Sequence, residues 1–136
     1  MAYIDIHNDI PGIRGLMQYS PDTAFVLNQL AQVLLADEAS MPKFDRELIA
    51  SFVSSRNECK FCMTSHGAIA AHLPGGDQEL VEAVWRDYRS ASISEKLKSL
   101  LNIADKVHKG GRHVTEADIA AAKNKVPVIW IYMILS

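Results

Sequence analysis

Residues 47–66 read ELIASFVSSRNECKFCMTSH and indicate two helices joined by a short break. In the first half, apolar residues recur at the spacing of one helix face, and this pattern stops at Arg56 and Asn57. We expect one helix that begins near Asp45 and a second helix from about residue 59 to residue 72. The segment therefore favours an all-α fold built from helices that pack against each other.

Four residues of this segment could carry chemistry: Glu47, Cys59, Cys62 and His66, in the pattern E-x11-C-x2-C-x3-H. Residues three and four apart share a helix face, so the two cysteines and the histidine are predicted to lie on one stripe. The start of a helix favours an anion, and a thiolate there is expected to have a pKa below its usual value of about 8.5. One thiolate could attack an electrophilic sulfur or a peroxide oxygen, and the other cysteine could then close a disulfide.

Other interpretations of the same residues remain open. A structural zinc site normally uses four ligands, so Cys59, Cys62 and His66 would need Glu47 or a more distant residue as the fourth. The two cysteines could also be small apolar core residues beside a hydrogen-bonded histidine. Spacing alone favours a Glu47 that faces solvent or complements the helix dipole.

Two segments, RELIA at residues 46–50 and NECKFCMTSH at residues 57–66, resemble the carboxymuconolactone decarboxylase superfamily. The chain is most similar to the AhpD-like alkylhydroperoxidase branch, and a looser resemblance covers about residues 10–125. The resemblance implies an all-α, AhpD-like helical bundle. It also implies a homo-oligomer, either a trimer or a hexamer.

The resemblance implies a role for each of the four residues. Cys62 would be the peroxidatic thiol and Cys59 the resolving, more exposed thiol, while His66 and Glu47 would relay the proton. Phe61 departs from the best-known peroxidases of this branch, which have a histidine at that position. The relay is therefore expected to have one member fewer.

The implied function is that of a thiol-dependent peroxidase or disulfide oxidoreductase, which reduces alkyl hydroperoxides in antioxidant defence. No organic cofactor is implied, and a lipoylated or thioredoxin-like protein would regenerate the dithiol. One alternative is a carboxymuconolactone-type decarboxylase, whose acid–base chemistry needs no cysteine pair. Another is a redox-sensing or structural oligomeric module without enzymatic activity, whose disulfide would switch its assembly.

The length of 136 residues suits a single domain over residues 1–136, and 49% hydrophobic with 22% charged residues is ordinary globular usage. A net charge of −2 provides no basic surface for nucleic acid. The first residues, MAYID, lack the charged and apolar pattern of an export signal, so we expect a cytoplasmic protein. In a reducing compartment a cysteine pair is more often catalytic than structural.

Helix signals also flank the central segment. Ser20 and Pro21 predict the start of a helix, Asp77 predicts the cap of another, and residues 92–95 (SISE) predict a capping box. Gly110 and Gly111 predict a helix end, and residues 115–118 (TEAD) predict a further capped start. The helix that begins at Pro21 is expected to face the core through its apolar residues, which are Phe25, Val26, Leu30, Val33 and Leu34.

The last segment, VPVIWIYMILS at residues 126–136, is apolar and does not resemble the family. Its 11 residues are too few for a membrane span, which needs about twenty. Codons for this segment, read one base earlier, can spell GASDLDIHDTV, which is similar to the usual continuation of the family. We therefore hypothesise a one-base frameshift that gives this chain an atypical tail.

Overall fold

The computed structural model describes residues 10, 12–37, 39 and 41–123, which form helices and no strand. This confirms the predicted all-α class. Within these residues no helix has the length and apolar character that a membrane span requires. The α-helices are α1 (Ile13–Tyr19), α2 (Pro21–Ala31), α3 (Lys43–Arg56), α4 (Lys60–His72), α5 (Gln78–Asp87), α6 (Glu95–Lys109) and α7 (Glu116–Lys123), with a π-helix at Gln32–Ala36 and a 3-10 turn at Gly111–His113.

The chain divides into two compact units, Met1–Glu38 and Ala39–Ser136. The first contains α1, α2 and the π-helix, and the second contains α3 to α7. The prediction of a single domain over residues 1–136 stays a prediction. The tail at residues 126–136, and with it the frameshift hypothesis, lies outside the described residues.

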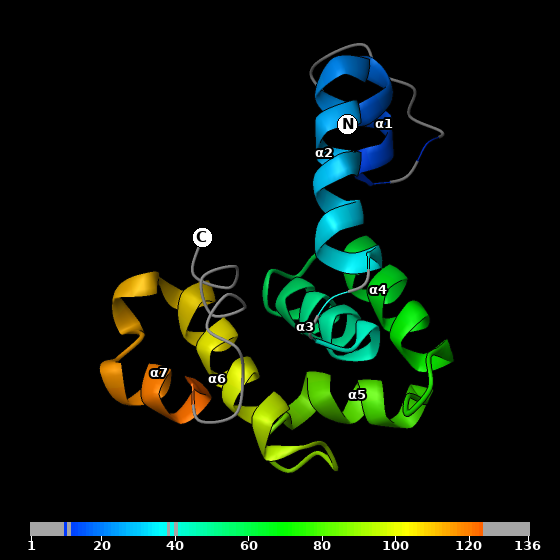
Figure 1. The fold of residues 1–136 in the computed structure, drawn as a ribbon. Helices are drawn as coiled ribbons and strands as arrows, with labels where there is room; N and C mark the ends of the chain where they lie inside the picture. The colour runs from blue at the N-terminus through cyan, green and yellow to red at the C-terminus, as the bar shows by residue number, and fades with distance from the viewer. Residues whose placement is uncertain (1–9, 11, 38, 40, 124–136) are drawn as a thin grey trace. The chain divides into compact units, whose positions relative to one another are not determined.

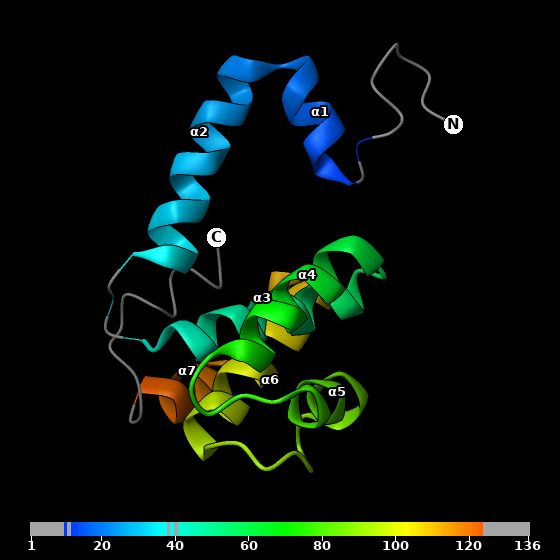
Figure 2. The same cartoon turned by 90° about the vertical axis from the view of Figure 1, so that its right-hand side faces the viewer.

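In the second unit, α3 is the central helix. It packs against α4, α5 and α6, and α7 packs against α6 (Figures 1 and 2). The core forms where these helices meet, because each presents an apolar stripe to its neighbours. Its fully buried large side chains include Leu48, Phe52, Val81, Val84, Leu97 and Leu101.

Several helix ends lie where local sequence signals predicted them. Helix α2 begins with Pro21 at its first position, and Asp77 caps α5 by accepting a hydrogen bond from a backbone N–H. Gly110 follows α6 with φ of 125°, a conformation that glycine adopts without strain. Before α7, the side chains of Thr115 and Asp118 each accept a hydrogen bond from the other's backbone N–H, which is a reciprocal capping box.

The predicted capping box at residues 92–95 is wrong in its cap residue. Ser94, not Ser92, is the N-cap of α6, and its hydroxyl oxygen accepts a hydrogen bond from Leu97 N at 3.2 Å. The helix therefore begins at Glu95 rather than before it. Both serines precede the same apolar run, so the sequence did not distinguish them.

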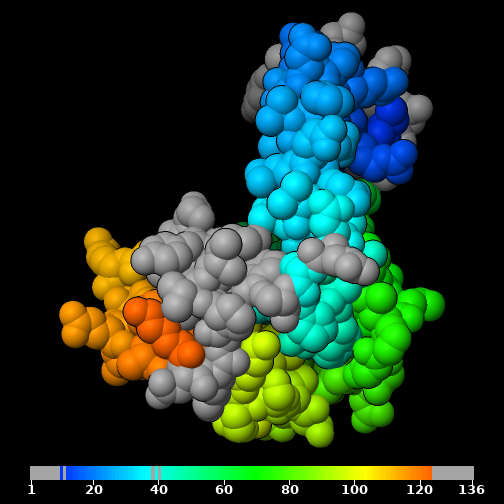
Figure 3. All heavy atoms as spheres, viewed as in Figure 1, coloured from blue at the N-terminus to red at the C-terminus, as the bar shows by residue number. Residues whose placement is uncertain are grey.

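Helix α2 differs from its prediction in what covers its apolar face. Phe25 and Val26 are each 65% exposed, and Leu30 and Val33 are 52% and 59% exposed, so the helices of the first unit do not cover the face that was predicted to lie against the core. Helix α1, which was not predicted, adds further exposed apolar side chains. Figure 3 shows the outer surface of this hairpin in blue to cyan. The exposed large apolar residues of α1 are Ile13, Leu16 and Tyr19.

Candidate functional site

The site begins at the break between α3 and α4. Helix α3 ends at Arg56, and the chain then turns through Asn57 and Glu58, whose φ is 55°. This left-handed conformation costs a residue other than glycine about 1 kcal/mol. The backbone N–H of Cys59 donates to Ser54 O at 3.0 Å, so the turn places Cys59 at the N-cap of α4.

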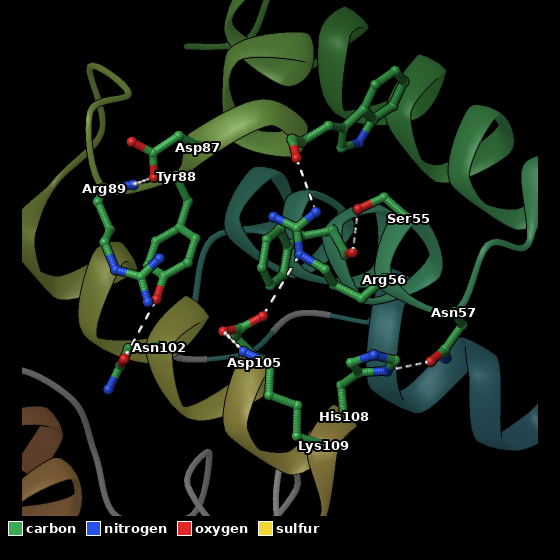
Figure 4. Close-up of polar contacts among 12 residues, drawn as sticks. Ser55, Arg56, Asn57, Asp87, Tyr88, Arg89, Asn102, Asp105, His108 and Lys109 are labelled. Carbon is green, nitrogen blue, oxygen red and sulfur yellow. Dashed lines mark hydrogen bonds and ion pairs between the residues drawn. The ribbon is translucent and has the colours of Figure 1, made fainter.

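A backbone carbonyl of α5 and side chains of α6 hold this turn (Figure 4). Arg56 Nη1 donates to Trp85 O at 3.0 Å, and Arg56 Nε lies 3.6 Å from Asp105 Oδ1. One residue further on, Asn57 Oδ1 lies 2.8 Å from His108 Nδ1. The strained turn before the dithiol is thus anchored by residues distant in the sequence.

Cys59 and Cys62 lie close together as free thiols, and both are half-buried. The Cys62 thiol donates a hydrogen bond to the Cys59 sulfur, which is the main reason that the pKa of Cys59 lies below its ordinary value. Backbone N–H groups of Cys62 and Phe61 act in the same direction. The same hydrogen bond, followed by burial and by the charge on Cys59, raises the pKa of Cys62. The first thiolate of the pair therefore forms on Cys59.

Glu47 and His66 meet across the interface of α3 and α4. Glu47 Oε2 lies 2.8 Å from His66 Nδ1, although the residues are 19 positions apart. The glutamate side chain is 4% exposed and the histidine side chain 26% exposed, so Glu47 does not face solvent as spacing alone favoured. When Nδ1–H donates to the carboxylate, Nε2 is left to accept a proton, and His66 lies one helical turn from Cys62. The pair can therefore act as a base toward a thiol on the same face.

Ser51, a fully buried residue of α3, was not predicted from the sequence as part of the site. Its hydroxyl contacts both α4 and α5. Its position four residues after Glu47 was the available signal, because such residues share a helix face. Among the residues that the structure describes, no group of three or more His, Cys, Asp and Glu side chains could hold a metal ion.

No family model and no curated protein matches this chain. Two crystal structures of uncharacterized peroxidase-related proteins match it over 93% of its length. One, from Ralstonia eutropha, is described as an alkylhydroperoxidase AhpD core and superposes with a TM-score of 0.79 at 24% identity. The other, from a Silicibacter species, has a TM-score of 0.80 at 26% identity. The chain spans about two-thirds of their length, namely 66% and 67%.

These likenesses confirm the AhpD-like helical fold that the resemblance implied. The chain has an AhpD-like fold and is related by structure to peroxidase-related proteins. The cysteine pair lies at the junction of α3 and α4 within that fold.

Proposed function

We propose that this chain is a thiol-dependent peroxidase or disulfide oxidoreductase that reduces alkyl hydroperoxides in antioxidant defence. The observation that carries the proposal is the contact of the buried Glu47 with the half-buried His66, which lies one helical turn from Cys62. A dithiol alone fits many functions, whereas a dithiol with its own base fits a reaction in which a thiol must lose a proton.

In the proposed reaction, the Cys62 proton passes to His66, and Glu47 stabilises the resulting imidazolium. The Cys62 thiolate attacks the terminal peroxide oxygen, so that an S–O bond forms and the O–O bond breaks. The leaving alkoxide takes the proton from His66 and departs as an alcohol, so the imidazole returns to its neutral form. Cys59 then attacks the Cys62 sulfenic acid, and the disulfide forms as water leaves. Two electrons pass from the dithiol to the peroxide.

The two pKa shifts bear on which thiol attacks first. The pKa of Cys59 is lowered, whereas the pKa of Cys62 is raised, so Cys62 is the thiol that depends on a base to remove its proton. His66, the base that contacts Glu47, shares a face of α4 with Cys62, and this favours Cys62 as the peroxidatic thiol. Cys59 is then the resolving thiol.

The disulfide must be reduced before another peroxide can react. A lipoylated or thioredoxin-like protein is the proposed reductant: its dithiol attacks the Cys59–Cys62 disulfide through a mixed disulfide and is itself oxidised. The proposed reaction has no step that needs a bound cofactor.

Multiple turnover tests this function. Purified protein is mixed with excess cumene hydroperoxide and excess dihydrolipoamide, and alcohol formation is followed with a protein-free reaction as the background. We expect many equivalents of alcohol per protein chain. A single equivalent would contradict the enzyme proposal and favour the redox-sensing module, and the absence of any alcohol would contradict both. Release of carbon dioxide from a carboxymuconolactone would support the decarboxylase.

We also propose that the chain assembles as a homo-oligomer. The exposed apolar residues of α1 and α2 support this, because a helix that is apolar on several faces is ordinarily covered. Light scattering of the purified protein should give the mass of a trimer or hexamer, and a monomer mass at micromolar concentration would contradict the proposal.

A further inference from the structure

The contact between α3, α4 and α5 is unusually close around one residue of α4, Gly67. A Cβ atom added to Gly67 would lie 2.6 Å from Trp85 Cζ2 and 3.1 Å from Ser51 Oγ. Any larger residue therefore requires the Trp85 ring, and with it the contact at Ser51, to shift. Gly67 directly follows His66, so this close approach lies next to the proposed base.

A single buried hydroxyl joins the three helices at this point. Ser51 Oγ donates to Met63 O of α4 at 2.9 Å and accepts from Trp85 Nε1 of α5 at 2.8 Å. Ser51 is 0% exposed, so neither partner can be replaced by water without a rearrangement. The hydroxyl uses its donor and an acceptor, which fixes its orientation.

The same contact lies beside the proposed base, in the same interface of α3 and α4. Ser51 is four residues after Glu47 on α3, and Met63 is three residues before His66 on α4. Both pairs share a helix face, so the contact from Ser51 to Met63 runs beside the contact from Glu47 to His66. Trp85 is itself held, because its backbone carbonyl accepts from Arg56 at 3.0 Å.

We propose that Ser51, held by Trp85, is a positioning residue that sets α4 against α3 so that Glu47 reaches His66. This inference rests on the proposed function, since it assigns Ser51 a part in activating Cys62. If the Ser51 hydroxyl only stabilised the fold, its removal would lower the free energy of unfolding and do nothing else. If it positions the base, its removal also changes the reactivity of Cys62, and this change depends on Glu47.

The test measures the alkylation rate of Cys62 by iodoacetamide from pH 6 to pH 10 in a Cys59→Ser background, where Cys62 is the only thiol. Glu47→Gln is expected to slow the reaction at neutral pH and to move its pH profile upward, because the imidazolium loses its carboxylate partner. Ser51→Ala is expected to do the same by about fivefold, the factor for the loss of one hydrogen bond. Ser55→Ala is the matched control, because its hydroxyl donates to Phe52 O within α3.

The double variant gives the decisive comparison. If Ser51 acts through Glu47, adding Ser51→Ala to Glu47→Gln causes little further loss, so the two effects are strongly non-additive. A Ser51→Ala rate equal to the control, or two effects that simply multiply, overturns the proposal.

Trp85→Phe provides a second variant, which removes the indole donor but keeps Ser51. It should shift the pH profile in the same direction by about twofold, since the hydroxyl remains present but less firmly held, and an unchanged profile would also count against the proposal.

The alkylation test is independent of peroxide turnover. Non-additive slowing in a protein that does not reduce hydroperoxides would overturn the proposed function but leave Ser51 as a positioning residue. Turnover that is lost in Glu47→Gln but unchanged in Ser51→Ala would support the proposed function and overturn the positioning role of Ser51. The thermal unfolding midpoint of each variant, measured alongside, shows that the compared proteins are folded at the assay temperature.

Discussion

Two helix pairs of this molecule have similar apolar sequences and different surroundings. Between α3 and the helices packed against it, Leu48 and Phe52 are fully buried. In the α1–α2 hairpin, Phe25 and Val26 are each 65% exposed. Apolar spacing predicts that a helix has a face to cover, but it does not identify the residues that cover it.

The interface of α3 with α4 and α5 has the features of a contact made within the chain. Gly67 permits a close approach, and the polar residues Ser51 and Glu47 are buried only where they have hydrogen-bond partners. The described residues of the hairpin have no comparable buried polar contact between α1 and α2. Specific polar contacts accompany the helices that form the site, whereas the hairpin offers an apolar surface that suits a second copy.

Truncation of one leucine in each pair should give the largest contrast. Leu48→Ala removes a fully buried side chain and is expected to lower the free energy of unfolding by about 2–5 kcal/mol. Leu30→Ala removes one that is 52% exposed and should change it by less than about 0.5 kcal/mol under monomeric conditions. Urea unfolding followed by circular dichroism measures both. Equal losses would mean that the hairpin is covered within the chain.

Gly67→Ala should have the second largest effect, because it disturbs the interface of α3, α4 and α5. The added methyl group meets Trp85 and Ser51, so the free energy of unfolding should fall by about 1–3 kcal/mol. Gly111→Ala is the matched control, because a Cβ there has no other atom within 4 Å. Thermal unfolding of both variants checks this, and equal midpoints would contradict the close approach of the helices.

Glu47→Gln tests the chemistry at the interface of α3 and α4 rather than its packing. We expect hydroperoxide turnover at pH 7 to fall about tenfold, because the uncharged amide stabilises the His66 imidazolium less well. Glu79→Gln, at an exposed position in α5, serves as the control. A rate equal to that of the control would exclude Glu47 from the reaction.

A charged contact between α6 and α7 offers a smaller effect that depends on pH. Lys106 Nζ lies 2.7 Å and 2.6 Å from the two carboxylate oxygens of Asp118, and this contact, followed by hydrogen bonds from Thr115, lowers the pKa of Asp118 well below its ordinary value. A lowered pKa in the folded state stabilises the protein above the unfolded pKa of about 4, and this stability is lost as the pH falls toward the folded value. Asp118→Asn should cost about 1 kcal/mol at pH 7, an amount that reflects partial solvent screening.

Urea unfolding of the parent and of Asp118→Asn at several pH values checks this prediction. The difference between the two should shrink as the pH falls below about 4, where the unfolded carboxylate takes up a proton. A difference that stays constant down to pH 2 would show that the charge of Asp118 is not its source.

Local chemistry explains what could be predicted from the sequence. Pro21, Asp77 and Thr115 mark helix starts because their effects depend on neighbours within one turn. The contact of Glu47 with His66 depends on how the chain turns between two helices, and only the resemblance to a family indicated it. The order of the two cysteine pKa values depends on which thiol donates, which no spacing reveals. Nor could the exposure of α2 be predicted, since periodicity does not distinguish a core from an interface.

The most direct test of the account is thiol titration before and after one equivalent of cumene hydroperoxide, under metal-free conditions. We predict that the parent loses both thiols to an internal disulfide. Cys59→Ser should still consume the peroxide and stop at the sulfenic acid, whereas Cys62→Ser should not consume it. Two free thiols in the treated parent would contradict the dithiol peroxidase, and peroxide consumption by Cys62→Ser at the parent rate would contradict the assignment of Cys62.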